Sequence, residues 1–293
     1  MVTARILNST AALISCAVNQ PLSRLRSGLA GGALALLASI APAQAAEGEC
    51  SLGVQPILSE QQTQKAFQPL ADYLGKIAGK KCVVRTSPNF LAYWDQVRKG
   101  GMFDLVLDAA HFTDYRVQKQ GYEILAKVPD TVSYSLIVSD QNPIIDATEL
   151  IAKRIATLGV PSIGAARLNG LFPNPTRQPM TVEIESSEKG IELLRAGKVT
   201  AAILPTPIVS QQMAQGGGIS VVLTTEPIPH IALSASPLIP VATRNQMRQA
   251  LVNAEKTAEG RDMLKAIGFE RFDPANSTIY AGQSRTLRDY WGF

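Results

Sequence analysis

The sequence predicts an α/β protein of two lobes, each a mostly parallel sheet flanked by helices, joined by two hinge crossings. Three observations indicate this class: short apolar runs alternate with amphipathic stretches, glycines close many of those stretches, and two polar connections divide the pattern into two sets. The chain has 293 residues, 46% hydrophobic and 18% charged. This composition is typical of a folded protein and excludes a disordered or fibrous one.

The first 45 residues are typical of an export signal. Two arginines precede the apolar stretch 28–40, and small residues follow up to Ala45, which is the order of a secretory signal peptide. We expect a signal peptide over 1–45, with cleavage after Ala45. A short buried helix is the structural alternative. The residues just before Cys16 are of the types found in a lipoprotein box. The apolar stretch in front of them is short and interrupted, so lipoprotein anchoring is not expected.

The net charge of +4 comes mostly from this segment, which carries three arginines and no acidic residue. The remainder has 25 basic and 24 acidic residues. Such a balance argues against a nucleic-acid-binding protein, which needs a sustained basic face. No run of about 20 apolar residues occurs, so a conventional membrane span is not expected.

Export would leave two cysteines in the mature chain, Cys50 and Cys82, each at the start of an apolar run. An even pair in an oxidising compartment favours a disulfide. If the two runs are adjacent parallel strands, the sulfurs lie near one edge of the sheet. Two free buried thiols are the alternative, and a thiol count under denaturing, non-reducing conditions separates the two.

The elements of the first set follow from periodicity and helix-end signals. A helix over 59–77 begins at Ser59, an N-cap residue type, and carries its apolar stripe on Phe67, Leu70 and Leu74 before Gly79 ends it. By the same reasoning we expect strands at 52–57, 83–85, 105–107, 122–128 and 134–139, and helices at 90–99 and 111–119.

A second set begins after the polar segment 140–143. We expect strands at 155–160, 182–184, 199–204, 219–224 and 231–234, and helices at 146–152, 187–195, 207–215, 243–253 and 257–267. A second polar connection lies at 225–229. If the chain crosses twice, lobe 1 comprises 46–138 and 228–293, and lobe 2 comprises 139–227. Such a hinge places a cleft at the ends of parallel strands, where ligands prefer to bind.

Catalytic constellations are scarce. The chain has two histidines, His111 and His230, and lacks a glycine-rich phosphate loop, a Cys-x-x-Cys pair and a His-Glu-x-x-His motif. Asp104 and Asp108 could act as an acid–base pair across a strand, but we prefer a structural role for Asp104, with Asp108 alone reaching the cleft. A Ser-His-Asp triad has no supporting Gly-x-Ser-x-Gly elbow. We therefore expect no enzyme activity, no metal site and no cofactor.

Three helix starts in the second set carry hydroxyl residues. Ser162 lies where a strand runs into a helix, and Ser187 and Thr206 lie at two further helix starts. Backbone N–H groups at such positions bind anions without a charged side chain. Ordinary N-capping is the alternative for each one alone.

Six segments, in order, resemble the phosphonate/phosphate/phosphite substrate-binding proteins of ABC importers. They are Gly-Val-Gln-Pro at 53–56, Phe-Gln-Pro-Leu-Ala-Asp-Tyr-Leu at 67–74, Phe-Asp-Leu-Val at 103–106, Tyr-Ser-Leu-Ile-Val at 134–138, Ala-Gly-Lys-Val-Thr-Ala-Ala at 196–202 and Pro-Ile-Pro-His at 227–230. The resemblance covers most of residues 50–255. It implies a type 2 periplasmic binding-protein fold, a location in the periplasm, a small anionic ligand and an inner-membrane permease as partner. We expect a monomer.

The helix starts, the position of Asp108 and His111 after a strand, and the resemblance together indicate the ligand contacts. In the family's anion loop, rich in Ser and Thr, only Ser162 keeps a hydroxyl here, and Ser187 stands where the family has a histidine. The expected ligand-binding residues are Ser162, Ser187 and Thr206 around the anionic group, with Phe90, Tyr93, Asp108, His111 and Tyr134 on the other wall.

One alternative keeps the fold and drops transport: a periplasmic sensor or accessory protein that meets a signalling partner. Gene neighbourhood separates the two, because an importer receptor usually sits beside a permease and an ATPase.

Overall fold

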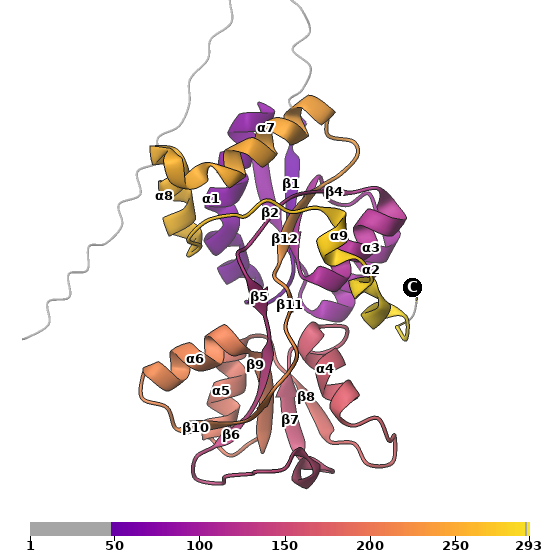
Figure 1. Cartoon of the computed structure of the whole chain (residues 1–293), viewed down its shortest axis with the longest axis vertical. Helices are drawn as coiled ribbons and strands as arrows, with labels where there is room; N and C mark the ends of the chain where they lie inside the picture. Colours follow the sequence, from indigo (N-terminus) through magenta and orange to yellow (C-terminus); the bar gives the residue numbers. More distant parts are fainter. Residues whose placement is uncertain (1–47, 291) are drawn as a thin grey trace, which may run out of the picture. The chain divides into compact units, whose positions relative to one another are not determined.

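Two five-stranded sheets form the framework of the chain in the computed structural model, which describes residues 48–290 and 292–293 (Figure 1). The expected signal peptide and Cys16 lie outside the described residues. The first sheet has the order β2-β1-β3-β12-β4 and the second β10-β6-β9-β7-β8. The first comprises β1 Cys50–Val54, β2 Cys82–Arg85, β3 Leu105–Asp108, β4 Glu123–Lys127 and β12 Ala232–Ala235; the second comprises β6 Tyr134–Ser139, β7 Arg154–Thr157, β8 Met180–Glu183, β9 Ala201–Pro205 and β10 Ile219–Thr224.

Each sheet is mostly parallel with one reversed strand. In the first sheet β12 runs antiparallel to β3 and β4, and in the second β6 runs antiparallel to β9 and β10. These two strands follow the crossings: the chain enters the second sheet through β6 and returns to the first through β12. The crossings pair with each other, since β5 (Thr131–Val132) and β11 (Ile228–Pro229) form a short antiparallel ladder. The two-lobed α/β class with two crossings is confirmed. The predicted boundary assigns most of the strand at 134–139 to lobe 1. In the structure this strand lies in the second sheet.

The helices begin and end close to the expected positions. Ser59 caps the first helix, α1, in a capping box with Gln62, and Gly79 ends it with a left-handed φ of 65°. The helices are α1 Glu60–Ala78, α2 Phe90–Lys99, α3 Ala110–Gln120, α4 Ile163–Leu171, α5 Ser187–Arg195, α6 Thr206–Ala214, α7 Val241–Val252, α8 Ala258–Ile267 and α9 Ser277–Tyr280, with 3-10 turns η1 Ala147–Leu150, η2 Ala254–Lys256 and η3 Gln283–Leu287. The sequence missed β5, β11, α9 and η3, which are too short to show a period.

Several expected elements are shorter in the structure, among them the strands expected at 52–57 and 122–128, and two others end early at a residue with positive φ. The helix expected over 146–152 is the single turn η1, because Ala152 takes a positive φ of 61°. The strand expected over 155–160 ends at Thr157, since Gly159 is left-handed with φ 79°. A Cβ at Gly159 would lie 2.5 Å from the Glu183 side chain, so the turn needs glycine for space as well as for conformation.

The C-terminal helices pack against the first sheet. Met247 and Leu251 of α7 and Leu264 of α8 lie in one apolar cluster with Leu70 and Leu74 of α1. Figure 1 shows α7 and α8 next to α1. The segment after the return crossing therefore completes the apolar core of the first lobe.

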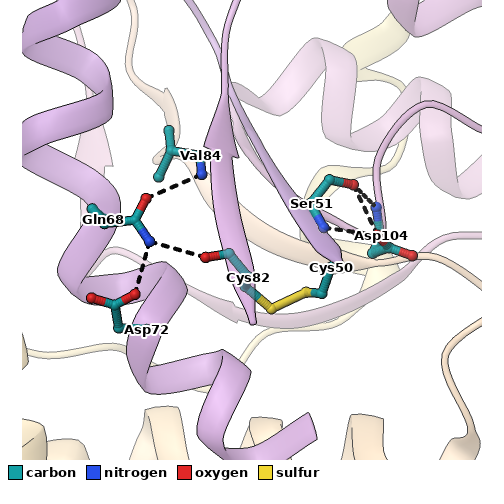
Figure 2. The surroundings of a disulfide bond; sticks show 7 residues. All are labelled: Cys50, Ser51, Gln68, Asp72, Cys82, Val84 and Asp104. Atoms are coloured by element: carbon teal, nitrogen blue, oxygen red, sulfur yellow. Dashed lines mark hydrogen bonds between the residues drawn. A yellow bond between two sulfur atoms is a disulfide. The ribbon is translucent and has the colours of Figure 1, made fainter. Parts of the chain in front are cut away.

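A disulfide and two polar side chains fix one end of the first sheet (Figure 2). Cys50 and Cys82 are opposite one another in the parallel β1–β2 ladder and are bonded, with an S–S distance of 2.03 Å. The expected pairing is confirmed. Gln68 of α1 donates to the Cys82 carbonyl at 2.9 Å and accepts from the Val84 N–H at 3.3 Å, which ties the helix to the bonded strand.

Asp104 lies at this same end. Its carboxylate accepts from the Ser51 N–H at 2.8 Å and from the Ser51 hydroxyl at 2.9 Å, and so links β1 to the segment that leads into β3 (Figure 2). Asp108 is the last residue of β3. The two carboxylates therefore belong to opposite ends of the strand, and Asp104 has the structural role that the sequence favoured over an acid–base pair.

Loss of the disulfide should destabilise the chain by about 3 to 4 kcal/mol in the chain-entropy treatment of the closed loop. Urea unfolding with and without reductant measures this difference. The double variant Cys50→Ala/Cys82→Ala is the control, because its midpoint should not respond to reductant. An equal midpoint for the oxidised and reduced wild type would contradict the prediction.

Candidate functional site

A cavity of about 240 Å³ lies between the two lobes. Both crossings contribute to its wall, through Val132 of β5 and through Ile228 and Pro229 of β11. The first lobe contributes Gln55, Ile57, Leu58, Phe67, Phe90, Ala109, His230, Ile231 and Phe269 to the lining. The second lobe contributes Tyr134, Leu158, Ser162, Ile163, Ser187, Glu188, Pro205, Pro207 and Ile208.

Five helices begin at this cavity. Phe90 and Ser187 are the first residues of α2 and α5, and Ala109, Ser162 and Pro205 are the N-caps of α3, α4 and α6; all five line the wall. The cause is topological, because each of these helices follows a parallel strand and starts at that strand's carboxyl end. The first backbone N–H groups of a helix have no partner within the helix and carry the positive end of its dipole. The cavity is therefore suited to a negatively charged group.

The two predicted serines occupy different cap positions. Ser162 is the N-cap of α4, and its hydroxyl accepts from the Ala165 N–H at 3.2 Å. The N-cap of α5 is Ser186, which accepts from the Lys189 N–H at 3.2 Å. Ser187 therefore keeps its hydroxyl out of the capping bond. Both Ser162 and Ser187 are buried at the cavity wall, together with Phe90 and Tyr134 from the expected set.

Thr206 has another role in the structure. Its hydroxyl accepts from the Ser133 hydroxyl at 2.9 Å and is hydrogen-bonded to the Ser135 hydroxyl at 2.9 Å, and its N–H donates to the Ser133 carbonyl. It does not line the cavity. These bonds attach the start of α6 to the strand that enters the second sheet.

Tyr93 and Asp108 lie in a buried ionic cluster of the first lobe and not at the cavity wall. Asp108 accepts from the Tyr93 hydroxyl at 2.9 Å, from Arg116 Nε at 3.1 Å and from the Thr113 hydroxyl at 3.0 Å. The Arg116 side chain is 1% exposed, and its guanidinium carbon lies 5.2 Å from the centre of the Tyr122 ring. Burial raises the pKa of Asp108, and the Arg116 guanidinium acts against that rise. These groups hold β3, α2 and α3 together behind the cavity.

His111 connects the two lobes. It is fully buried, and its Nε2 lies 2.9 Å from the carbonyl oxygen of Pro161, in the segment that leads into α4. A carbonyl only accepts, so Nε2 carries the proton and donates. Nδ1 is buried with no hydrogen-bond partner among the described residues. Burial lowers the pKa of His111 to about 3, so the ring is neutral at pH 7. His111 does not line the cavity.

Three polar lining residues were outside the expected ligand set: Gln55, Glu188 and His230. Gln55 accepts from the Ala109 N–H at 3.0 Å, and His230 Nδ1 accepts from the Ile231 N–H at 2.8 Å. Burial lowers the pKa of His230 to about 4. Glu188 is exposed. Gln55 and His230 both lie in segments that resemble the family, and this resemblance is the feature of the sequence that could have identified them.

The family model for phosphonate ABC transporter periplasmic substrate-binding proteins matches residues 52–280. The chain belongs to this family. The expected resemblance is thereby confirmed, and the chain is a substrate-binding protein of the class that captures ligands for ABC importers. No curated protein sequence gives a significant match.

Solved structures support the fold of this family member. PhnD1 of Prochlorococcus marinus, in complex with methylphosphonate, is 15% identical with a TM-score of 0.69, over 82% of this chain and 97% of that one. A Xanthomonas citri protein bound to ATP is 14% identical with a TM-score of 0.65, over 81% and 98%. A binding component of a Pseudomonas aeruginosa phosphonate transporter is 15% identical with a TM-score of 0.64, over 83% and 85%. At these identities the likeness establishes the fold alone.

The structure describes residues 48–290 and 292–293 of this family member. No helix within them is long and apolar enough to cross a membrane. Within the same residues, no group of three or more His, Cys, Asp or Glu side chains is placed to hold a metal ion.

Substitution of Arg116 by Met should cost about 3 to 5 kcal/mol of unfolding free energy, because it leaves the Asp108 carboxylate buried without its cation. The double variant Asp108→Leu/Arg116→Met should lose less than the single variant. Arg85→Met is the matched control: it removes an exposed ion pair with Glu49, which is worth about 1 kcal/mol or less. Urea denaturation of the four proteins tests this, and a double variant less stable than Arg116→Met would contradict it.

The buried histidines should make the protein less stable as the pH is lowered. Their folded pKa values, about 3 for His111 and about 4 for His230, lie below the unfolded value of about 6.5. The unfolded chain therefore takes up protons first, and stability declines as the pH falls below about 6.5. Between pH 7 and 5 each histidine should cost about 2 kcal/mol. Urea midpoints across this range measure the slope. His111→Gln should reduce it, and an unchanged slope in that variant would contradict the assignment.

Proposed function

We propose that this chain is a periplasmic receptor that captures a small ligand carrying an anionic group between its lobes and passes it to the permease of an ABC importer. The observation that carries the proposal is the set of five helix starts around one interlobe cavity. In this proposal residues 1–45 direct export and are removed, and the mature chain acts as a monomer without a lipid anchor.

The anionic group would be held at the starts of α4 and α5. Ser162 and Ser187 supply hydroxyls there, and the N-terminal N–H groups of the two helices supply donors with a favourable dipole. Phe90 and Tyr134 would contact the rest of the ligand, since both line the same cavity. The remaining four expected residues would act indirectly, by holding the walls of the cavity in place.

Ligand capture would be coupled to lobe closure. The hydrogen bond from His111 to the Pro161 carbonyl joins the lobes and would break if they moved apart. A ligand that contacts both lobes binds the closed arrangement better than the open one, and so shifts the population toward it. A permease that distinguishes the two arrangements would then recognise the loaded receptor.

We also propose that the chain has no catalytic activity. Asp104 is bonded to Ser51 and Asp108 to Tyr93, Thr113 and Arg116, so neither carboxylate is available as a general acid or base at the cavity.

Calorimetry of the mature chain against phosphate, phosphite, alkylphosphonates, sulfonates and carboxylates tests the proposal. At least one of these anions should bind, and Ser162→Ala should weaken its binding about tenfold or more, because a hydrogen bond to a charged group is lost. Thr257→Ala is the matched control. It removes the cap of α8 at a residue that does not line the cavity, and should leave affinity unchanged. Folded protein that binds none of the panel would refute capture of an anion.

A further inference from the structure

The wall of the interlobe cavity is mostly apolar. Of the 21 residues that line it, 15 have aliphatic, proline or phenylalanine side chains. Phe67 and Phe269, whose rings are 6.2 Å apart, lie together on the first-lobe side. Such a surface gains free energy by contact with hydrocarbon and offers nothing to the oxygens of a compact oxyanion.

The charges at the wall do not suit a doubly charged ligand. Among the described residues that line the cavity, none is lysine or arginine, and Glu188 contributes a carboxylate. The main fixed positive charge comes from helix N-termini, each worth about half an elementary charge. Phosphate and phosphonate dianions are usually held by charge-assisted bonds to cationic side chains. The two starts proposed to hold the head, those of α4 and α5, together supply about one elementary charge, which matches a single negative charge better than two.

The two lobes contribute polar groups of different kinds to the wall. The serine hydroxyls at the wall, those of Ser162 and Ser187 at the starts of α4 and α5, belong to the second lobe. On the first-lobe side, the side-chain oxygen of Gln55 and Nδ1 of His230 accept backbone N–H groups, so the Gln55 amide N–H groups and the His230 Nε2–H are the donors that these side chains offer. A bound molecule thus meets two serine hydroxyls on the second lobe, and on the first lobe two N–H-bearing side chains within a mainly apolar surface.

We propose that the ligand is a small organic monoanion with an apolar body, its charged head at the starts of α4 and α5 and its body against the first lobe. This inference rests on the proposed function. The size agrees with it, since an apolar cavity of about 150 Å³ accommodates benzene and this one measures about 240 Å³. An aromatic or branched aliphatic carboxylate, or a phosphonate monoester, has this chemistry.

Matched pairs of ligands that share a head and differ in the body test the inference by calorimetry on the mature chain. Phenylacetate should bind at least about tenfold more tightly than acetate, because its ring is buried. The monoethyl ester of phenylphosphonate should likewise bind more tightly than the monoethyl ester of methylphosphonate.

Two lysine variants give a second test. Ile208→Lys introduces a cation at the half-buried cavity wall and should shift the preference toward methylphosphonate and phosphate by about tenfold or more. Val221→Lys is the matched control, since it adds the same charge to the second lobe at an exposed position of β10 outside the lining, and should leave the preference unchanged.

The outcomes separate the two proposals. If acetate and the monoethyl ester of methylphosphonate bind as tightly as their aryl partners, the apolar-body inference is overturned and the receptor function stands. The same holds if Ile208→Lys behaves like Val221→Lys. If the folded chain binds no member of either pair and none of the wider anion panel, the proposed function fails and this inference fails with it.

Discussion

The arrangement of the molecule depends on the pairing of its two crossing segments. Val132 lies opposite Ile228, and Thr131 opposite Pro229, so the outgoing and returning chains run side by side. Because the chain crosses out and back, each sheet receives one reversed strand, β6 or β12, among four strands of common direction. The carboxyl ends of the parallel strands in both sheets then lead into the same cavity. The five helix starts that line it follow from this topology.

The chain separates the charges that stabilise the fold from the groups available to a ligand. Its strongly buried ion pair, Asp108 with Arg116, is enclosed by Tyr93, Phe103 and Tyr122 inside the first lobe. The cavity itself offers backbone dipoles and hydroxyls. When such a site closes, the free-energy cost of desolvating charged side chains is small. Its selectivity depends on shape and on apolar contact as much as on charge.

The fold was predictable from the sequence because its helices carry both a period and end signals, as Ser59 and Gly79 do for α1. The site was predictable only in part. Ser162, Ser187, Phe90 and Tyr134 line the cavity, since position at a helix start or strand end determines which edge of the sheet a residue occupies. Side-chain direction was not predictable. Asp108 points to Arg116, two helical turns along α3, and Thr206 bonds to serines about 70 positions earlier.

The position of β12 in the first sheet has a consequence for the order in which the chain can be assembled. All strands of the second sheet lie between Tyr134 and Thr224, in one continuous stretch. The first sheet is instead interrupted, because β12, at 232–235, inserts between β3 and β4. If the chain becomes available from its N-terminus onward, the second sheet can therefore be completed before the first sheet. Until residue 235 is available, β3 and β4 present unpaired edges. The first sheet, and not the second, is therefore the one that keeps open edges for longer as the chain is assembled.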